Sequence, residues 1–558
     1  MINIIIFSFA TNFFYYCLGS FFFSKNKNVD NLVFYKTITG TIIASFIAIL
    51  LNFFIPLNRI VNTSIFFFVI LIFLLKNKLN IKKEEIFFLI TSSLICFFLI
   101  ILSNVNRPDA GLYHLPYISV LNEYKIIFGL NNLHARFGHV SIIQYLCALN
   151  NNFFFKDNGI VIPLASVASF YYLYFTNEVL KIYKKKNKID AASIFSLATL
   201  IYISFKIIGY DNFGNDAIAH LSFFYLITEV LKNENESKNI NIKFIFLVSV
   251  FIFLNKSTMI FIFIIPTLII IDKYKFDYKK IFSLIKSFPT IFLAIWLIKN
   301  IIVSGCAIYP ISFTCIPSLP WLNINSVNIF SIQSEAWAKA WPENQNPNLT
   351  MEFFINNFNW VHAWTKIHLI YILTIIIPYC VVLTLLLLFL KISKKNFYDK
   401  FNIIKIPKFY WLTFFVSFLG TLYFFFKFPL YRYGYSYLVS LIILIFIFFL
   451  KDKILKTRTV NACKFIFLAS LIIFLGKQSF RIINNYQLNY FNKPWPRIYS
   501  FNDNSKINSE KRIIDNNFLY YYSKNGECMF SSPPCTNYKV DKNIIAKEIL
   551  SYTLLVYK

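Results

Sequence analysis

The chain has 558 residues, of which 57% are hydrophobic, and its formal net charge is +29. With a mean hydropathy of +0.58 it is too apolar for a soluble globular protein, so we predict an all-α polytopic membrane protein. The positive charge does not indicate nucleic-acid binding, because Lys and Arg fall in short clusters between apolar runs, as in cytoplasmic loops.

Apolar runs long enough to cross about 30 Å of hydrocarbon follow one another along most of the chain. We predict roughly fourteen crossings, at 2–23, 33–55, 62–76, 86–103, 158–180, 190–208, 216–231, 243–255, 258–271, 281–303, 367–390, 409–426, 434–450 and 461–479. The first run has no basic start and no small-residue cleavage site, so we expect it to be retained. With the basic clusters in the cytoplasm, both termini lie outside.

This topology predicts six parts of the chain. They are N-terminal transmembrane helices (1–103), a first outer loop with an amphipathic helix (104–157), central transmembrane helices (158–303), a large outer loop (304–366), C-terminal transmembrane helices (367–480) and an outer tail (481–558). The large segments all face outward, and loops on a rigid scaffold usually carry function, so we expect the site on the outer side.

The first outer loop begins with RPDAGLYHLPY, in which Asp109, Tyr113 and His114 precede a segment that resembles an interfacial amphipathic helix. Asp109 is interpreted either as a helix cap or as a general base that takes a proton from an acceptor hydroxyl. Farther along, Arg136 stands between two histidines in HARFGH, a pattern that suits a phosphate clamp.

Charged residues also adjoin the central helices. Asp211 and Asp216 precede or begin an apolar run, where acidic groups are favourable through the helix dipole alone. Lys256 interrupts the apolar sequence between two short crossings. It either snorkels to the interface or contacts the phosphate of a lipid carrier.

Later outer segments add further candidates. Tyr309 precedes a proline in the large loop, where it either anchors the chain at the interface or belongs to the site. Arg432 begins a late apolar helix and suits either phosphate recognition or pairing with an outer carboxylate. Outward cysteines predict two disulfides, which pair Cys306 with Cys315 and Cys528 with Cys535. No zinc-ligand spacing accompanies them.

Together these motifs resemble the GT-C superfamily of membrane glycosyltransferases, which take a sugar from a polyprenyl-phosphate carrier. The resemblance rests on the order of short motifs between about residues 86 and 450: D-x-x-x-Y-H from Asp109, a later Asp, Lys-Ser-Thr at 256–258, K-N-x-x-x-x-G-x-x-x-Y-P from Lys299, and R-Y at 432–433. The first loop through RFGH, with GECMFSSPPCT in the tail, is also similar to an uncharacterised family of bacterial multi-spanning proteins associated with surface polysaccharides.

The resemblance implies transfer with inversion in a bacterial inner membrane, from a polyprenyl-phosphate-linked sugar to a glycan, lipid or protein acceptor. Asp109 would be the base, and Lys256 and Arg432 would lie near the carrier phosphate. The resemblance implies no cofactor. The superfamily usually has two adjacent acidic residues in this loop, whereas this chain has only Asp109, so the use of a divalent metal stays open. A flippase for lipid-linked oligosaccharides and a polysaccharide polymerase or ligase remain alternatives, as does a non-catalytic assembly protein.

Overall fold

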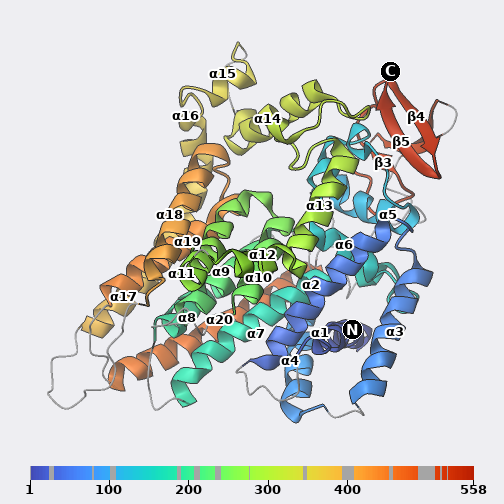
Figure 1. The fold of residues 1–558 in the computed structure, drawn as a ribbon. Helices are drawn as coiled ribbons and strands as arrows, with labels where there is room; N and C mark the ends of the chain where they lie inside the picture. Colours follow the sequence, from blue (N-terminus) through green and yellow to red (C-terminus); the bar gives the residue numbers. More distant parts are fainter. Residues whose placement is uncertain are drawn as a thin grey trace.

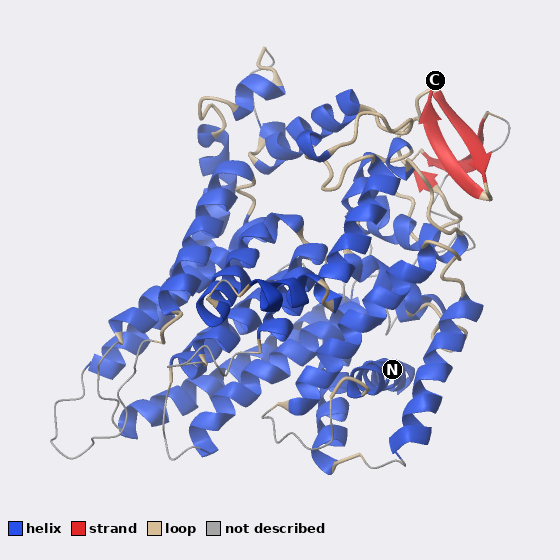
Figure 2. Cartoon of the chain, viewed as in Figure 1, coloured by secondary structure: helices blue, strands red, loops and turns tan. Residues whose placement is uncertain are grey.

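The protein is described from a computed structural model, and it is mainly helical (Figure 1, Figure 2). The structure describes all residues except 1, 24–30, 78–80, 101–108, 185–189, 207–213, 233–240, 276, 344–347, 392–406, 451–456, 488–508, 516–517 and 525.

Helices occupy each predicted crossing. In chain order they are α1 (Ile2–Ser20), α2 (Leu32–Asn52), α3 (Arg59–Asn77), α4 (Lys83–Ile100), α7 (Ile162–Lys184), α8 (Ala191–Phe205), α9 (Asp216–Leu231), α10 (Ile242–Asn255), α11 (Ile264–Tyr274), α13 (Phe288–Ser304), α17 (Ile370–Lys391), α18 (Tyr410–Lys427), α19 (Tyr431–Phe449) and α20 (Thr457–Gln487). Within the described residues, eight helical segments are long and apolar enough to span a membrane, which makes the chain a multi-pass membrane protein.

Close helix packing begins at the N-terminus, where α1 and α2 cross at two glycines. A Cβ at Gly19 would meet the carbonyl oxygen of Lys36 at 1.8 Å, and one at Gly40 would meet that of Tyr15 at the same distance. Small residues allow such backbone approach between membrane helices. Farther along the chain, α7, α8 and α9 are buried along nearly all of their apolar lengths.

Three features differ from the predictions. The tail contains strands, described below, so the all-α prediction was wrong for this part of the chain. The other two differences concern helices. The run predicted as one crossing at 281–303 is divided into α12 (Tyr278–Ile285) and α13, which begins at Phe288 after the N-cap Ser287 and carries Pro289 in its first turn. The helix predicted to lie amphipathically at the interface is α5 (Leu115–Glu123), but every residue from Leu115 to Asn122 is buried. The interfacial prediction was therefore wrong, because other parts of the protein cover the expected outer face.

Of the remaining helices and strands, all but α6 (Ile142–Leu149) gather at one end of the bundle, whereas α6 packs inside it against α2, α5 and α7 (Figure 1). The elements at this end are α14 (Ile324–Ala338), α15 (Met351–Ile355), α16 (Val361–Trp364), β1 (Ser509–Ile514), β2 (Phe518–Ser523), β3 (Cys535–Thr536), β4 (Ile544–Ile549) and β5 (Tyr552–Tyr557). The order β1-β2-β3 forms one sheet, antiparallel and then parallel, and β4 and β5 form an antiparallel hairpin.

Hydrogen bonds tie the first loop, the large loop and the tail together. The side-chain amide of Asn132 donates to the carbonyl oxygens of Trp321 at 3.0 Å and Leu555 at 2.9 Å. Phe128 forms two backbone hydrogen bonds with β5: its nitrogen donates to the Thr553 oxygen, and its oxygen accepts from the Leu555 nitrogen. The three large segments therefore share one side of the bundle, and the tail folds against the first loop.

Candidate functional site

Four of the candidate residues meet in one polar cluster. The ammonium of Lys256 donates to Asp216 Oδ1 and, at 2.8 Å, to the backbone oxygen of Arg432. The guanidinium of Arg432 in turn donates from Nη1 to Asp109 Oδ2 at 2.6 Å. The structure thus joins residues from the first loop, α9, the end of α10 and α19.

Lys256 lies at the break that the sequence predicts. The backbone is extended there (φ −151°), which ends α10, and a 3₁₀ helix, η6 (Ser257–Phe263), leads into α11. Its side chain is buried, and Nζ lies 4.7 Å from the ring centre of Tyr433. The snorkelling interpretation is therefore wrong, since the ammonium is held inside the protein by Asp216.

Asp109 precedes a short π-helix, η1 (Ala110–His114), and its side chain makes no capping hydrogen bond, so the cap interpretation is wrong. Burial raises the pKa of Asp109, but the surrounding groups, first of all the guanidinium of Arg432 and also Arg136, together outweigh burial, and the net pKa lies below the usual value of 3.8. The carboxylate is therefore ionised at neutral pH. Its side chain is 25% exposed, which leaves it accessible to a substrate.

His220, which the sequence analysis did not assign, positions Arg432. Its Nε2 donates to the Arg432 carbonyl oxygen at 2.9 Å, so Nδ1 accepts from Ser436 Oγ at 2.7 Å. Four residues separate His220 from Asp216, which places both on one face of α9. This i, i+4 spacing from Asp216 is the sequence feature that could have identified His220 as part of the site.

A cavity of about 170 Å³ adjoins the cluster. The predicted site residues that line it are Tyr113, His114, Arg136, Asp216, Lys256 and Tyr309. Apolar side chains complete the wall, including Leu254, Trp296, Trp337 and Phe428. Asp109 and Arg432 are not among the described lining residues, so their ion pair lies beside the cavity, next to Tyr113 and Tyr433.

The ring of His114 is fixed in one tautomer. The Ser141 backbone nitrogen donates to Gln144 Oε1 at 3.0 Å, which turns the amide nitrogen of Gln144 towards His114 Nδ1 at 2.6 Å. The neutral ring therefore carries its proton on Nε2. Burial lowers the pKa of His114 to about 4, so it is a neutral donor at physiological pH.

Arg136 contributes a positive charge beside Tyr113. Its guanidinium lies 5.0 Å from the ring centre of Tyr113, and no carboxylate within the described residues forms an ion pair with it. Nearby, Lys299 is fully buried and its Nζ is 3.5 Å from the Val140 carbonyl oxygen. The described lining thus holds two cationic side chains, Arg136 and Lys256, against one carboxylate, Asp216, which favours an anionic ligand.

Polar amides and a hydroxyl connect the helices around the cavity. Ser141 Oγ donates to Asn255 Oδ1 at 3.1 Å, and the Asn215 amide donates to the backbone oxygen of Asn255. All three residues line the cavity, and none was singled out from the sequence. Asn and Ser are too common beside membrane helices for their positions alone to mark them.

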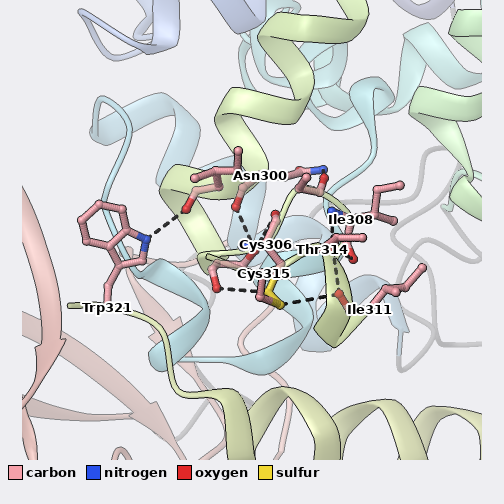
Figure 3. Close-up of a disulfide and its surroundings, with 10 residues drawn as sticks. Asn300, Cys306, Ile308, Ile311, Thr314, Cys315 and Trp321 are labelled. Carbon is pink, nitrogen blue, oxygen red and sulfur yellow. Dashed lines mark hydrogen bonds between the residues drawn. A yellow bond between two sulfur atoms is a disulfide. The ribbon is translucent and has the colours of Figure 1, made fainter. Parts of the chain in front are cut away.

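Tyr309 enters the cavity wall from the large loop. A Cβ at Gly138 would meet Tyr309 Cδ1 at 2.5 Å, so glycine allows this approach. A disulfide between Cys306 and Cys315 closes the loop that carries Tyr309 (Figure 3). Beside it, Trp321 Nε1 donates to the carbonyl oxygen at the end of α13 (Figure 3).

The tail supports the segment that carries Asp109. Backbone nitrogens of Cys528 and Met529 donate to the Gly111 carbonyl oxygen at 3.0 and 2.9 Å. Cys528 is also joined to Cys535 in the second expected disulfide.

Asp211 lies outside the described residues. In the described part of the chain, no three His, Cys, Asp or Glu side chains are grouped as metal ligands.

Comparison with known families gives one match. The family model described as "Domain of unknown function (DUF8201)" matches residues 1–439, which include every residue of the cluster and the cavity. No curated protein and no solved structure matches the chain.

Proposed function

The chain belongs to the DUF8201 family, and we propose that it is a membrane glycosyltransferase of the GT-C type. It would move a sugar from a polyprenyl-phosphate carrier to a glycan, lipid or protein acceptor on the outer side of a bacterial inner membrane. The observation that carries the proposal is the joining of Asp109, Arg432, Lys256 and Asp216 beside a cavity that is both cationic and apolar.

The lining suits a phosphate that carries a lipid chain. Arg136 and Lys256 offer charged donors, and guanidinium groups bind phosphate oxygens in bidentate geometry. Leu254 and Phe428 supply apolar surface beside these donors. A free nucleotide sugar would gain nothing from that apolar surface, whereas an isoprenoid chain would be buried against it.

In the transfer step, the acceptor hydroxyl attacks the anomeric carbon and gives its proton to Asp109. The bond from that carbon to the phosphate oxygen breaks, and the polyprenyl phosphate leaves with the bonding electron pair. Attack from the opposite face inverts the anomeric centre. Arg136 and Lys256 stabilise the charge that develops on the leaving phosphate.

Arg432 links donor binding to the base. Its guanidinium has five N–H donors, and only Nη1 is bound to Asp109. A phosphate that engages the other nitrogens would draw the guanidinium away from the carboxylate. Asp109 would then be a stronger base when the donor is present than when the site is empty.

The test replaces Asp109 by Asn in cells that carry this variant as their only copy. Asn keeps the shape and removes the basicity, so we expect the surface glycan to lose the transferred sugar. Asp272→Asn is the matched control, because that acid pairs with Lys408 at the far end of α11. Unaltered glycans in a stably folded Asp109→Asn variant would refute the proposal and favour the flippase alternative.

A further inference from the structure

A second cavity lies on the same side of the bundle, between the first loop and the tail. Its volume is about 830 Å³. The N-terminal end of α3, the C-terminal end of α5 and two parts of the tail contribute to its wall, namely Leu519 with Tyr521 and residues 530–533. None of its lining residues belongs to the first cavity, so it is a separate site.

The cavity wall contains an ordered network of polar side chains. Arg59 donates from Nη2 to Asp157 Oδ1 at 2.6 Å and from Nε to Asn151 Oδ1 at 3.2 Å. The Asn151 amide donates in turn to Asn122 Oδ1 at 3.1 Å, and both amides are buried. These side chains are therefore held in place before any ligand arrives, which lowers the entropy cost of binding.

The charge of this cavity differs from that of the first. Arg59 is matched by Asp157, and Glu123 makes no ion pair within the described residues. The lining therefore carries a small negative charge, which disfavours phosphates and other anions. The buried amides of Asn122 and Asn151 are already bonded within the protein, so the Glu123 carboxylate and the hydroxyls of Ser531 and Ser532 are the lining groups that can accept or donate hydrogen bonds. The aromatic side chains of Tyr124 and Tyr521 also line the cavity.

We propose that this second cavity binds a neutral oligosaccharide, the acceptor glycan of the transfer reaction. Sugar hydroxyls both donate and accept hydrogen bonds, as the lining requires, and their ring faces stack on tyrosine. The identification of the ligand as the acceptor rests on the proposed function. One helix connects the two sites: α5 follows His114 and ends at Glu123, so the cavities lie along a helix roughly 13 Å long.

The two cavities would therefore bind the two different substrates of the transfer reaction. The first holds the lipid-linked donor, and the second holds an acceptor chain of several sugar units whose end reaches Asp109. A single monosaccharide cannot occupy both sites, so the inference predicts that longer acceptors bind more tightly than short ones.

The test measures binding of labelled glycans to the full-length protein in lipid nanodiscs. The probes are neutral oligosaccharides released by mild acid from envelopes of a strain that lacks this gene, separated by size and labelled with a fluorophore. We expect saturable binding of at least one size fraction by fluorescence anisotropy. Glu123→Gln and Tyr124→Ala should each weaken it about tenfold or more.

Two control variants check that a loss of binding is specific to the second cavity. Glu548→Gln changes an exposed acid of the tail outside the cavity and should bind like the wild type, as should Asp272→Asn, whose acid pairs with Lys408 outside both cavities. No binding of any fraction, or full binding by monodisperse Glu123→Gln and Tyr124→Ala, would overturn the second site alone. Normal glycan binding together with unaltered surface glycans in the Asp109→Asn cells would instead overturn the transferase and leave a glycan-binding protein.

Discussion

The ion pair between Asp216 and Lys256 makes a quantitative prediction about stability. Both side chains are nearly buried, with exposed fractions of 11% and 6%. Removing one partner of a buried pair leaves the other charge unneutralised and costs roughly 3–5 kcal/mol. In the Asp216→Asn variant, the ammonium of Lys256 keeps its hydrogen bond to the Arg432 carbonyl oxygen at 2.8 Å and its contact with the Tyr433 ring at 4.7 Å. These contacts offset part of the loss, so we expect the free energy of unfolding to fall by about 3 kcal/mol.

The assay is SDS-induced unfolding in mixed micelles, followed by tryptophan fluorescence. The double variant Asp216→Asn with Lys256→Met removes the orphaned charge, so its loss should be smaller than the sum of the single losses by about 2 kcal/mol. Asp272→Asn breaks an exposed pair with Lys408 and should cost less than about 1 kcal/mol. The argument from burial would be refuted if each single variant lost as little unfolding free energy as Asp272→Asn. It would also be refuted if the loss in the double variant equalled the sum of the two single losses.

Three further predictions concern the site and its supports. Gly138→Ala forces a methyl group against the ring of Tyr309 and should destabilise the protein by about 1–3 kcal/mol in the same assay. Replacing Cys528 and Cys535 together by Ser should increase amide hydrogen exchange at residues 110–114, because the tail bonds to this segment; unchanged exchange would contradict the support role. Since the folded pKa of Asp109 is lowered, its contribution to stability is present above pH 3.8 and is lost as pH falls through the folded value. Unfolding midpoints should therefore fall less on acidification in Asp109→Asn than in the wild type.

The charged residues of the site could be predicted because ionisable groups beside apolar runs are rare and need partners. Asp109, Lys256 and Arg432 were found in this way. Pairing of Arg432 with an outer carboxylate was one of the two alternatives, and the structure confirms it. The sequence could not identify which carboxylate, since Arg432 and Asp109 are 323 residues apart in the chain. Only the packed bundle decides that Arg432 meets Asp109 whereas Lys256 meets Asp216.

Burial of α5 was beyond the sequence for a related reason. An amphipathic pattern from Leu115 to Glu123 is compatible with a membrane interface and with a helix covered by other protein. The tail that packs on this part of the loop lies more than 380 residues later, where Cys528 and Met529 bond to Gly111. The division between α12 and α13 was missed because only two residues, Lys286 and Ser287, interrupt the run between them.

Binding of a polyprenyl phosphate to the cavity tests the central claim most directly. The measurement compares the affinity of the wild type and Arg136→Gln for polyprenyl phosphate in nanodiscs of neutral lipid. Loss of one charged donor to a phosphate should weaken binding about tenfold or more. Equal affinities in the two proteins, or no binding by the wild type, would contradict the assignment of this cavity to a lipid-linked sugar donor.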